Sequence, residues 1–220
     1  MTLDFSVVTN AWQPLLFGIV GTLSLAFSGM VIAMIIGVLG VVILRMHLRL
    51  PSLLVNAFIE IVRNTPFLVQ IFFLFFALPL AGVRLNPTVT AILALGINGG
   101  AYAIEIIRGG VESIPRGQTE AGLALGLHKA QVFRLIVLKP ALRAIYPSLA
   151  SQFILLTLTT AICTSISAYE LTSVGQRIEA ETFRSFEVYF TLTGIYLVIS
   201  LATMWLLAGI GRWAFSYPTR

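Results

Sequence analysis

The chain has 220 residues, of which 58% are hydrophobic and only 10% are charged, and its formal net charge is +5. A soluble domain typically carries about 25% charged residues, so this chain has too few to cover a water-exposed surface. The composition excludes an ordinary soluble enzyme and a disordered chain, and it argues against nucleic-acid binding despite the basic pI near 9.8. A mean hydropathy of +0.95 indicates instead a protein that crosses a membrane several times.

Uncharged segments that could cross a membrane occur five times along the chain. They are residues 5–44, 64–83, 85–104, 144–169 and 188–211. A helix needs about 20 apolar residues to cross a ~30 Å hydrocarbon core, and these segments lack the alternating pattern of barrel strands. The sequence therefore predicts an all-α membrane protein in which residues 1–220 form a single transmembrane domain of about five helices.

The first uncharged segment, with 40 residues, is long enough for two spans. Residues 1–14 mix Asp4, Pro14 and other polar residues with apolar ones, which favours an interfacial segment. From residue 15 to residue 44 no Pro, Asn or Asp offers a turn, so we expect one helix there. A hairpin, and hence six helices, is the alternative, and it would move only the N-terminus to the other side. No Lys or Arg precedes Arg45, so we expect no conventional signal peptide.

The distribution of Lys and Arg predicts the orientation. With five spans, one side holds eleven basic residues: Arg45, Arg49, Arg63, Arg108, Arg116, Lys129, Arg134, Lys139, Arg143, Arg212 and Arg220. The other side holds three basic residues (Arg84, Arg177 and Arg184) and a loop around residues 170–187 with four acids (Glu170, Glu179, Glu181 and Glu187). The positive-inside rule then places the N-terminus outside and the C-terminus in the cytoplasm.

Residues that could catalyse a reaction or bind a metal are scarce. Cys163 is the single cysteine, and the two histidines, His47 and His128, lie far apart in the sequence. No pair has metal-ligand spacing, and Asp4 is the only aspartate that a Ser-His-Asp set could use. The chain also lacks the glycine-rich P-loop pattern that holds nucleotides. We therefore expect no enzyme activity, no metal and no cofactor in this chain.

Glycine and proline mark the expected helix ends and contacts. Pro51 begins the second region and Pro79 ends it, and Asn86-Pro87 begins the third helix. Gly109-Gly110 and Ile114-Pro115 are expected to interrupt the chain after Arg108. Small residues at helical spacing predict close packing between helices; they are Gly29, Ala33 and Gly37 in the first span and Gly96 and Gly100 in the third.

Residues 109–143 form the longest segment expected in the cytoplasm. Leucines and other large apolar residues are interleaved there with Lys and Arg, which predicts short amphipathic helices with a break at Gly126. Such a segment could lie on anionic lipid or could dock a soluble partner, and spacing alone favours neither.

Motifs in this segment resemble a known family. Glu120-Ala121-Gly122, then Gly126, and then Ile136 and Leu138 resemble the EAA loop of ABC importer permeases, E-A-A-x3-G-x9-I-x-L-P. Gly122 replaces the second Ala of that pattern, and Lys139-Pro140 places the Pro one position late.

Further stretches resemble the permeases of polar amino acid importers, the histidine, glutamine and arginine type. Arg63-Asn64-Thr65-Pro66-Phe67-Leu68-Val69-Gln70 resembles R-G-T-P-x-x-x-Q, and residues 101–110 resemble A-Y-x-x-E-x-x-R-G-G. Gly117-Gln118 resembles the G-Q ahead of the loop, and Glu170-Leu171 the later E-L. The family's K-x-T-S-L has no good copy near residues 158–162.

The resemblance implies a type I ABC importer permease in the bacterial plasma (inner) membrane. It implies a second permease copy or close homologue, two ABC ATPase subunits that bind ATP and Mg, and an extracytoplasmic solute-binding protein that delivers an amino acid. The loop at about residues 115–140 would couple to the ATPase through Glu120, Ala121, Gly122, Gly126, Ile136 and Leu138. This favours docking over lipid contact. A self-sufficient secondary transporter or channel is the alternative, although no internal repeat or paired intramembrane acids are evident.

Several polar residues in the spans are candidates for the substrate pathway. Asn98 lies near the middle of the third helix, and Glu105 follows seven residues later on the same face. An intramembrane carboxylate should be paired or hydrated, so Glu105 either attracts an ammonium group or forms a structural pair with Arg108 at i+3. Thr160, Thr164 and Ser165 line the fourth span, where their hydroxyls would either line the pathway or bond to backbone carbonyls.

Residues at the start of the second uncharged segment are candidates for a gate. Arg63, Thr65 and Pro66 would form either an orientation anchor with a proline kink or a helix break that hinges an inner gate. Gln70, one turn deeper, is expected to make an interhelical hydrogen bond rather than to bind a ligand.

Overall fold

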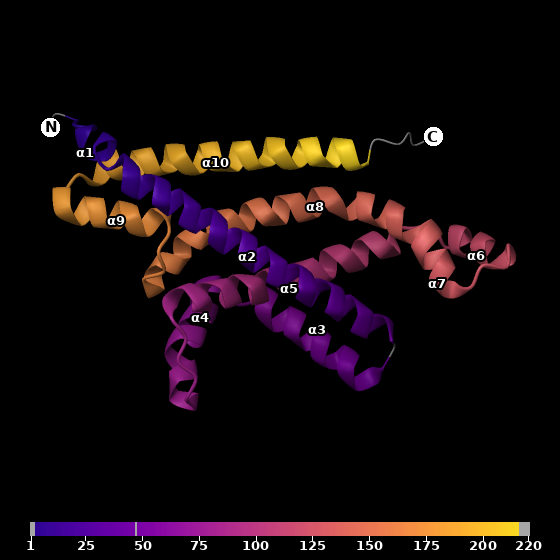
Figure 1. The fold of residues 1–220 in the computed structure, drawn as a ribbon. Helices are drawn as coiled ribbons and strands as arrows, with labels where there is room; N and C mark the ends of the chain where they lie inside the picture. Colours follow the sequence, from indigo (N-terminus) through magenta and orange to yellow (C-terminus); the bar gives the residue numbers. More distant parts are fainter. Residues whose placement is uncertain (1–2, 47, 216–220) are drawn as a thin grey trace.

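The computed structural model describes residues 3–46 and 48–215, so His47 and Arg220 lie outside the described residues. In this part of the chain every regular element is a helix, and there is no strand. The elements in order are α1 (Ser6–Thr9), α2 (Trp12–Arg45), α3 (Arg49–Arg63), α4 (Phe67–Phe72), η1 (Phe73–Ala77), η2 (Leu78–Ala81), α5 (Pro87–Glu112), α6 (Arg116–Ala124), α7 (Lys129–Val132), η3 (Phe133–Val137), α8 (Leu138–Thr159), η4 (Thr160–Ile166), α9 (Leu171–Thr182) and α10 (Ser185–Ala214). Figure 1 shows how they are arranged. The expected all-α class is confirmed.

Four helical segments of the described chain are long and apolar enough to cross a membrane: Trp12–Arg45, Pro87–Glu112, Lys129–Ile166 and Ser185–Ala214. A fifth candidate span is not straight. It consists of α3 and the segment Phe67–Ala81, which are bent by 109° relative to each other. The expected number of about five is therefore reached when this broken pair counts as one span.

The first span is one helix without a turn, as expected from the absence of Pro, Asn and Asp over residues 15–44. With 34 residues, α2 is about 51 Å long, more than a bilayer core requires. Residues before it form the short α1, which is tied to the start of α10 because the backbone N–H of Asp4 donates to Glu187 Oε1 at 3.0 Å.

Helices α2 and α5 pack closely, and small residues allow the approach. A β-carbon at Gly29 would lie 2.8 Å from Leu95 Cβ, and one at Gly37 would lie 2.7 Å from Ala103 Cβ. On the facing side, Gly96 and Gly100 contact Ile32 and Ile36 in the same manner. The close packing predicted from the small residues is confirmed. Next to it lies a core of buried apolar residues, among them Leu25, Ile71, Leu95, Leu156, Cys163 and Ile166.

Of the two expected interruptions after Arg108, the one at Ile114-Pro115 is confirmed, since it lies between α5 and α6. The one at Gly109-Gly110 is wrong, because α5 continues to Glu112. Gly110 is buried, and a side chain there would collide with Ile145 of α8. Two glycines inside a helix cost about 1 kcal/mol each relative to alanine, and here one of them provides the close contact with α8. The segment between the third and fourth spans is correspondingly shorter than expected.

The segment expected as an acidic outer loop contains helix α9, and two of its four acids, Glu170 and Glu187, are buried. Glu170 is fully buried and caps α9, accepting hydrogen bonds from the backbone N–H groups of Thr172 (2.8 Å) and Ser173 (2.6 Å). The Tyr196 hydroxyl donates to the same carboxylate at 2.8 Å. Burial raises the pKa of Glu170 despite these donated hydrogen bonds. The side chain of Glu187 is also buried, against Arg184 and the N-terminal segment.

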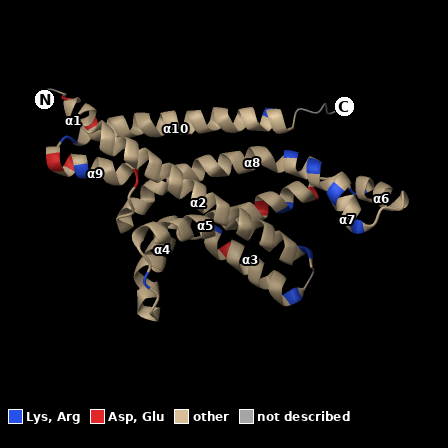
Figure 2. Ribbon diagram, viewed as in Figure 1, with Lys and Arg blue, Asp and Glu red and all other residues tan. Residues whose placement is uncertain are grey.

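Basic residues gather at one end of the helix bundle. Figure 2 shows blue segments at the loop from α2 to α3, in α7, at the start of α8 and near the end of α10. Figure 1 shows that α9 lies at the opposite end, together with the start of α2. The grouping of charges from which we predict the orientation is thus a feature of the folded molecule.

Candidate functional site

The break between α3 and α4 is the first part of the candidate site. Helix α3 ends at Arg63, and Pro66 is extended, with φ −63° and ψ 135°, just before α4 begins. A residue that precedes proline avoids the helical region, and proline itself lacks an N–H donor. The sequence Asn64-Thr65-Pro66 therefore ends one helix and starts another in a new direction. Of the two interpretations of Arg63, Thr65 and Pro66, the geometry agrees with a helix break.

The Gln70 side chain satisfies the carbonyl groups that the break leaves unpaired. Its Nε2 lies 2.8 Å from the carbonyl oxygen of Val62, 3.1 Å from that of Thr65 and 2.8 Å from Thr65 Oγ1. The Thr65 hydroxyl in turn donates to the carbonyl oxygen of Ile61 at 2.8 Å. Because the last carbonyls of a helix need partners, Gln70 stabilises the sharp bend itself.

Gln70 also connects the break to α5. Asn98 Nδ2 donates to Gln70 Oε1 at 3.0 Å, and both side chains are half-buried. The expected interhelical hydrogen bond of Gln70 is confirmed. A candidate pathway residue, Asn98, and two candidate gate residues, Thr65 and Gln70, therefore belong to one hydrogen-bonded cluster, which we call the amide cluster.

Two turns further along α5, Glu105 binds two arginines. Its Oε1 lies 2.7 Å from Arg108 Nη2, and its Oε2 accepts a hydrogen bond from Arg63 Nη1 at 2.9 Å. The Arg63 guanidinium also lies over the Tyr102 ring, 5.4 Å from its centroid. The i+3 pair with Arg108 is as expected from the spacing, whereas the pair with Arg63 is not evident in the sequence. Glu105 thus fastens the end of α3 to α5.

The hydroxyl residues of the fourth span lie in two different environments. Thr160 is buried, and its hydroxyl donates to the carbonyl oxygen of Thr157 at 2.7 Å. For this residue the structure shows the hydrogen bond to a backbone carbonyl, which was one of the two expected arrangements. Thr164 Oγ1 instead donates to Gln176 Oε1 of α9 at 3.1 Å, and Ser165 is exposed. Residues 160–166 form a 3₁₀ helix rather than an α-helix, so Thr160, Thr164 and Ser165 do not follow α-helical spacing.

The candidate coupling segment forms a hairpin of α6 against α7 and η3. Gly126 makes the turn with φ +81°, in the left-handed region that favours glycine. The N–H of Gly126 donates to the Leu123 carbonyl at 3.0 Å, and that of Leu127 to the Gly122 carbonyl at 3.2 Å, which is the pattern of a Schellman helix end. The expected break at Gly126 is confirmed.

The six candidate coupling residues divide into a packed set and an outward set. Gly122 is buried, and a β-carbon there would lie 2.6 Å from Ile136 Cδ1, so these two residues hold α6 against η3. Leu138 is half-buried at the start of α8. Glu120 and Ala121 are exposed, and near the turn Leu125 is 81% exposed. The exposed Leu125 offers apolar contact to a partner, and the exposed Glu120 offers a hydrogen-bond acceptor.

No group of three or more His, Cys, Asp or Glu residues within the described ranges is placed to hold a metal ion. The candidate functional features of the described structure are the amide cluster, the arginine-paired Glu105 and the outward face of the hairpin.

Known proteins resemble this chain over most of its length. Residues 29–215 match the family model described as "Binding-protein-dependent transport system inner membrane component". The glutamine transport system permease protein GlnP of Escherichia coli strain K12 is 36% identical over 214 residues, covering 96% of this chain and 98% of that protein. The L-cystine transport system permease protein TcyB of Bacillus subtilis strain 168 is 33% identical over 195 residues, covering 88% of this chain and 83% of that protein.

Solved structures show the same fold. A crystal structure of an amino acid ABC transporter with histidines superposes with a TM-score of 0.91 at 31% identity, covering 96% of this chain and 99% of the other. An inward-facing MetNI methionine ABC transporter superposes with a TM-score of 0.79 at 20% identity, covering 96% and 99%, which indicates a shared fold.

Proposed function

The chain belongs to the family of binding-protein-dependent transport system inner membrane components, and from this we propose that it is the membrane-spanning subunit of an ATP-driven amino acid importer. The observation that carries the proposal is the near full-length agreement with an amino acid ABC transporter, at a TM-score of 0.91 and 31% identity. The similarity to glutamine and L-cystine permeases supports the same class of substrate. In this proposal residues 1–220 act as one transmembrane domain in a bacterial inner membrane, with the N-terminus outside and the C-terminus in the cytoplasm.

The proposed substrate pathway follows the amide cluster along α5. Asn98 and Gln70 offer hydrogen-bond donors and acceptors that suit the ammonium and carboxylate groups of an amino acid. Glu105 lies two turns away and would add negative charge, although its two arginine partners offset that charge. Thr160, Thr164 and Ser165 are proposed to contribute to the wall of the pathway.

The proposed gate is the break at the end of α3. A bend of 109°, held by side-chain hydrogen bonds rather than by a continuous helix, lets α4 turn relative to α3 when those bonds rearrange. Arg63, Thr65, Pro66 and Gln70 would form the hinge, and the ion pair of Arg63 with Glu105 would hold its resting position.

The proposed coupling surface is the outward face of the hairpin within residues 115–140. Glu120, Ala121 and Leu125 would contact the ATPase partner, while Gly122, Gly126, Ile136 and Leu138 would hold the hairpin in shape. The assembly would contain two ATPase subunits, which bind ATP and Mg and hydrolyse the ATP, together with a second permease copy or homologue. An external solute-binding protein would meet the opposite end, near the exposed Glu181.

Reconstitution of the complete transporter into proteoliposomes tests the proposal. We expect uptake of a labelled amino acid to require both ATP on the ATPase side and an added binding protein on the other side. An ATPase partner with its P-loop lysine replaced serves as the control, and it should abolish uptake. Uptake that continues with this partner would support the alternative, a self-sufficient secondary transporter or channel. A panel of amino acids tested with the binding protein would then identify the substrate.

A further inference from the structure

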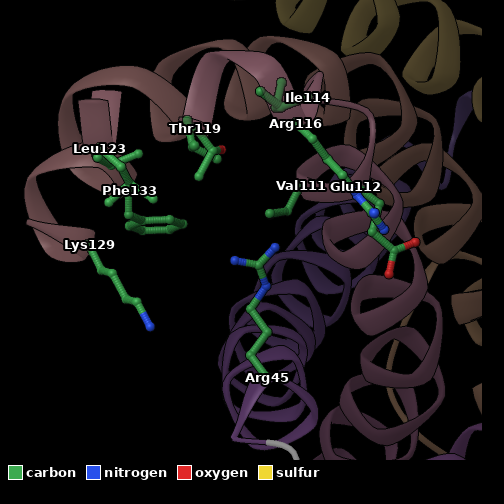
Figure 3. Close-up of a pocket in the computed structure, with 11 residues that line it drawn as sticks. Arg45, Val111, Glu112, Ile114, Arg116, Thr119, Leu123, Lys129 and Phe133 are labelled. Atoms are coloured by element: carbon green, nitrogen blue, oxygen red, sulfur yellow. The ribbon is translucent and has the colours of Figure 1, made fainter. Parts of the chain in front are cut away.

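The coupling hairpin covers a cavity of about 640 Å³. The cavity lies between the end of α2, the end of α5 and the inner side of the hairpin (Figure 3). Its wall combines basic side chains with apolar ones. Its volume falls in the range of small-molecule sites, about 300–1,000 Å³.

The charge of the cavity wall is predominantly positive. Arg45, Arg116 and Lys129 come from three different elements, and Glu112 is the only acid in the wall. In the part of the chain that the structure describes, none of the three basic side chains forms an ion pair or a hydrogen bond. Figure 3 shows the Arg45 guanidinium and the Lys129 ammonium pointing into the open space. Arg63 and Arg108 differ from these three residues, because both of them pair with Glu105.

The remainder of the wall is apolar. Val111, Ile114 and Val137 contribute to it, and Leu123 and Phe133 are 44% and 41% exposed. One residue of the wall, Arg45, is the first charged residue after the uncharged segment 5–44. A basic residue at the end of a membrane span marks the boundary between membrane and water. A ligand that suits this wall carries a compact anion at one end and apolar groups beside it.

We propose that this cavity binds the headgroup of an anionic phospholipid, with Arg45, Arg116 and Lys129 contacting its phosphate oxygens. Basic pockets between membrane helices on the cytoplasmic side are suited to such headgroups, and charge-assisted bonds from Arg and Lys to phosphate are strong. The apolar wall accommodates the glycerol and the first acyl carbons. A bound headgroup joins the end of α2 to the hairpin, so the lipid composition adjusts how firmly the hairpin is held.

A spin-labelled lipid experiment on the complete transporter in nanodiscs tests this site. It compares labelled phosphatidylglycerol with labelled phosphatidylcholine in the fraction of lipid immobilised by the protein. The site variant is Arg45→Gln with Lys129→Gln. The matched control is Arg49→Gln with Arg134→Gln, which removes two exposed basic residues at the same end but outside the cavity wall.

We expect the wild type and the control to prefer phosphatidylglycerol, and the site variant to lose about fivefold or more of that preference. The conservative variant Arg45→Lys with Lys129→Arg should restore it, which shows that the loss does not come from misfolding. An equal loss in the site variant and the control would overturn the proposal, since it would indicate a general surface charge effect.

Two further results would also overturn it. Displacement of the labelled phosphatidylglycerol by millimolar inorganic phosphate at constant ionic strength would identify a soluble anion as the ligand. Loss of the ATPase from the purified complex of the site variant, with the lipid preference unchanged, would assign the three basic residues to an acidic surface of the ATPase. The lipid measurement does not depend on transport, so its failure is distinguishable from failure of the proposed importer function.

Discussion

Two polar residues, Gln70 and Glu105, connect the bent helix pair of α3 and α4 to α5. Gln70 satisfies carbonyls of Val62 and Thr65 and also accepts a hydrogen bond from Asn98. Glu105 joins Arg63, from the other side of the break, to Arg108. Each residue therefore connects the local geometry of the break to a helix that is distant in sequence, and each is open to a direct test.

Replacing Gln70 with Leu should lower the free energy of unfolding by about 1–3 kcal/mol, because it leaves the carbonyls at the break and the Asn98 amide without their partner. The measurement is unfolding of the purified permease in mixed micelles with increasing SDS. Gln13→Leu is the control, since Gln13 is exposed at the start of α2, and it should change the stability little. Equal effects of the two variants would contradict the role assigned to Gln70.

A double-mutant cycle of Arg63→Gln and Glu105→Gln should give a coupling energy of about 0.5–1 kcal/mol. The value is modest because the two side chains are 40% and 25% exposed, so solvent screens the pair. The same unfolding assay measures it. Uptake and ATPase stimulation by Glu105→Gln in proteoliposomes form a separate readout. If both are unchanged, Glu105 has no substrate role and acts only in the ion pairs.

Among the elements, the hairpin of α6, α7 and η3 owes its shape to two glycines, Gly122 and Gly126. Its turn depends on the backbone conformation of Gly126, and its packing depends on the close contact of Gly122 with Ile136. A β-carbon at Gly122 would lie 2.6 Å from Ile136 Cδ1, so the alanine of the family pattern would require the Ile136 side chain to shift. The hairpin therefore presents Glu120 and Leu125 outward from a fixed base.

Gly126→Val should yield a membrane-inserted permease that no longer co-purifies with its ATPase. A β-branched residue at φ +81° is strained, although no atom lies within 4 Å of the added β-carbon. Gly126→Asn is the matched control, because asparagine tolerates the left-handed region, and this variant should retain most of the complex. Normal complex formation and transport by Gly126→Val would show that the turn conformation is not needed for docking.

For the whole molecule, the arrangement of charges along the helix bundle predicts its orientation in the membrane. The exposed Arg134 lies in the hairpin at the basic end, and the exposed Glu181 lies in α9 at the opposite end. The single native cysteine, Cys163, is buried. The chain is therefore well suited to labelling through single introduced cysteines.

In a Cys163→Ala background, Glu181→Cys should react with a membrane-impermeant maleimide added to intact cells. Arg134→Cys should react only after the cytoplasmic side is opened, because the positive-inside rule places the basic end there. Labelling of both variants from the same side would contradict the predicted topology. Labelling of Arg134→Cys in intact cells, with Glu181→Cys reacting only after opening, would show the opposite orientation. A hairpin at the N-terminus would leave both results unchanged.

Local features of the sequence predicted much of the fold and part of the site. The absence of turn residues over 15–44 predicted an unbroken helix, Asn86-Pro87 predicted the start of α5, and Gly126 predicted the turn. Each depends on backbone preferences of a few adjacent residues, which the sequence displays directly. Gly109-Gly110 did not follow this rule, because the contact of Gly110 with Ile145 of α8 is a property of packing.

The sequence alone determined that the protein crosses a membrane, how its spans are distributed and to which family its motifs point. Tertiary structure decided which polar residues meet. Arg63 and Glu105 are 42 positions apart, Gln70 and Asn98 are 28 apart, and neither separation has a periodic signal. It also decided that Glu170 is buried as a helix cap, and that Arg45, Arg116 and Lys129 share one cavity. The physical reason is that such contacts depend on where helices cross, and crossing is set by the shapes of many side chains together.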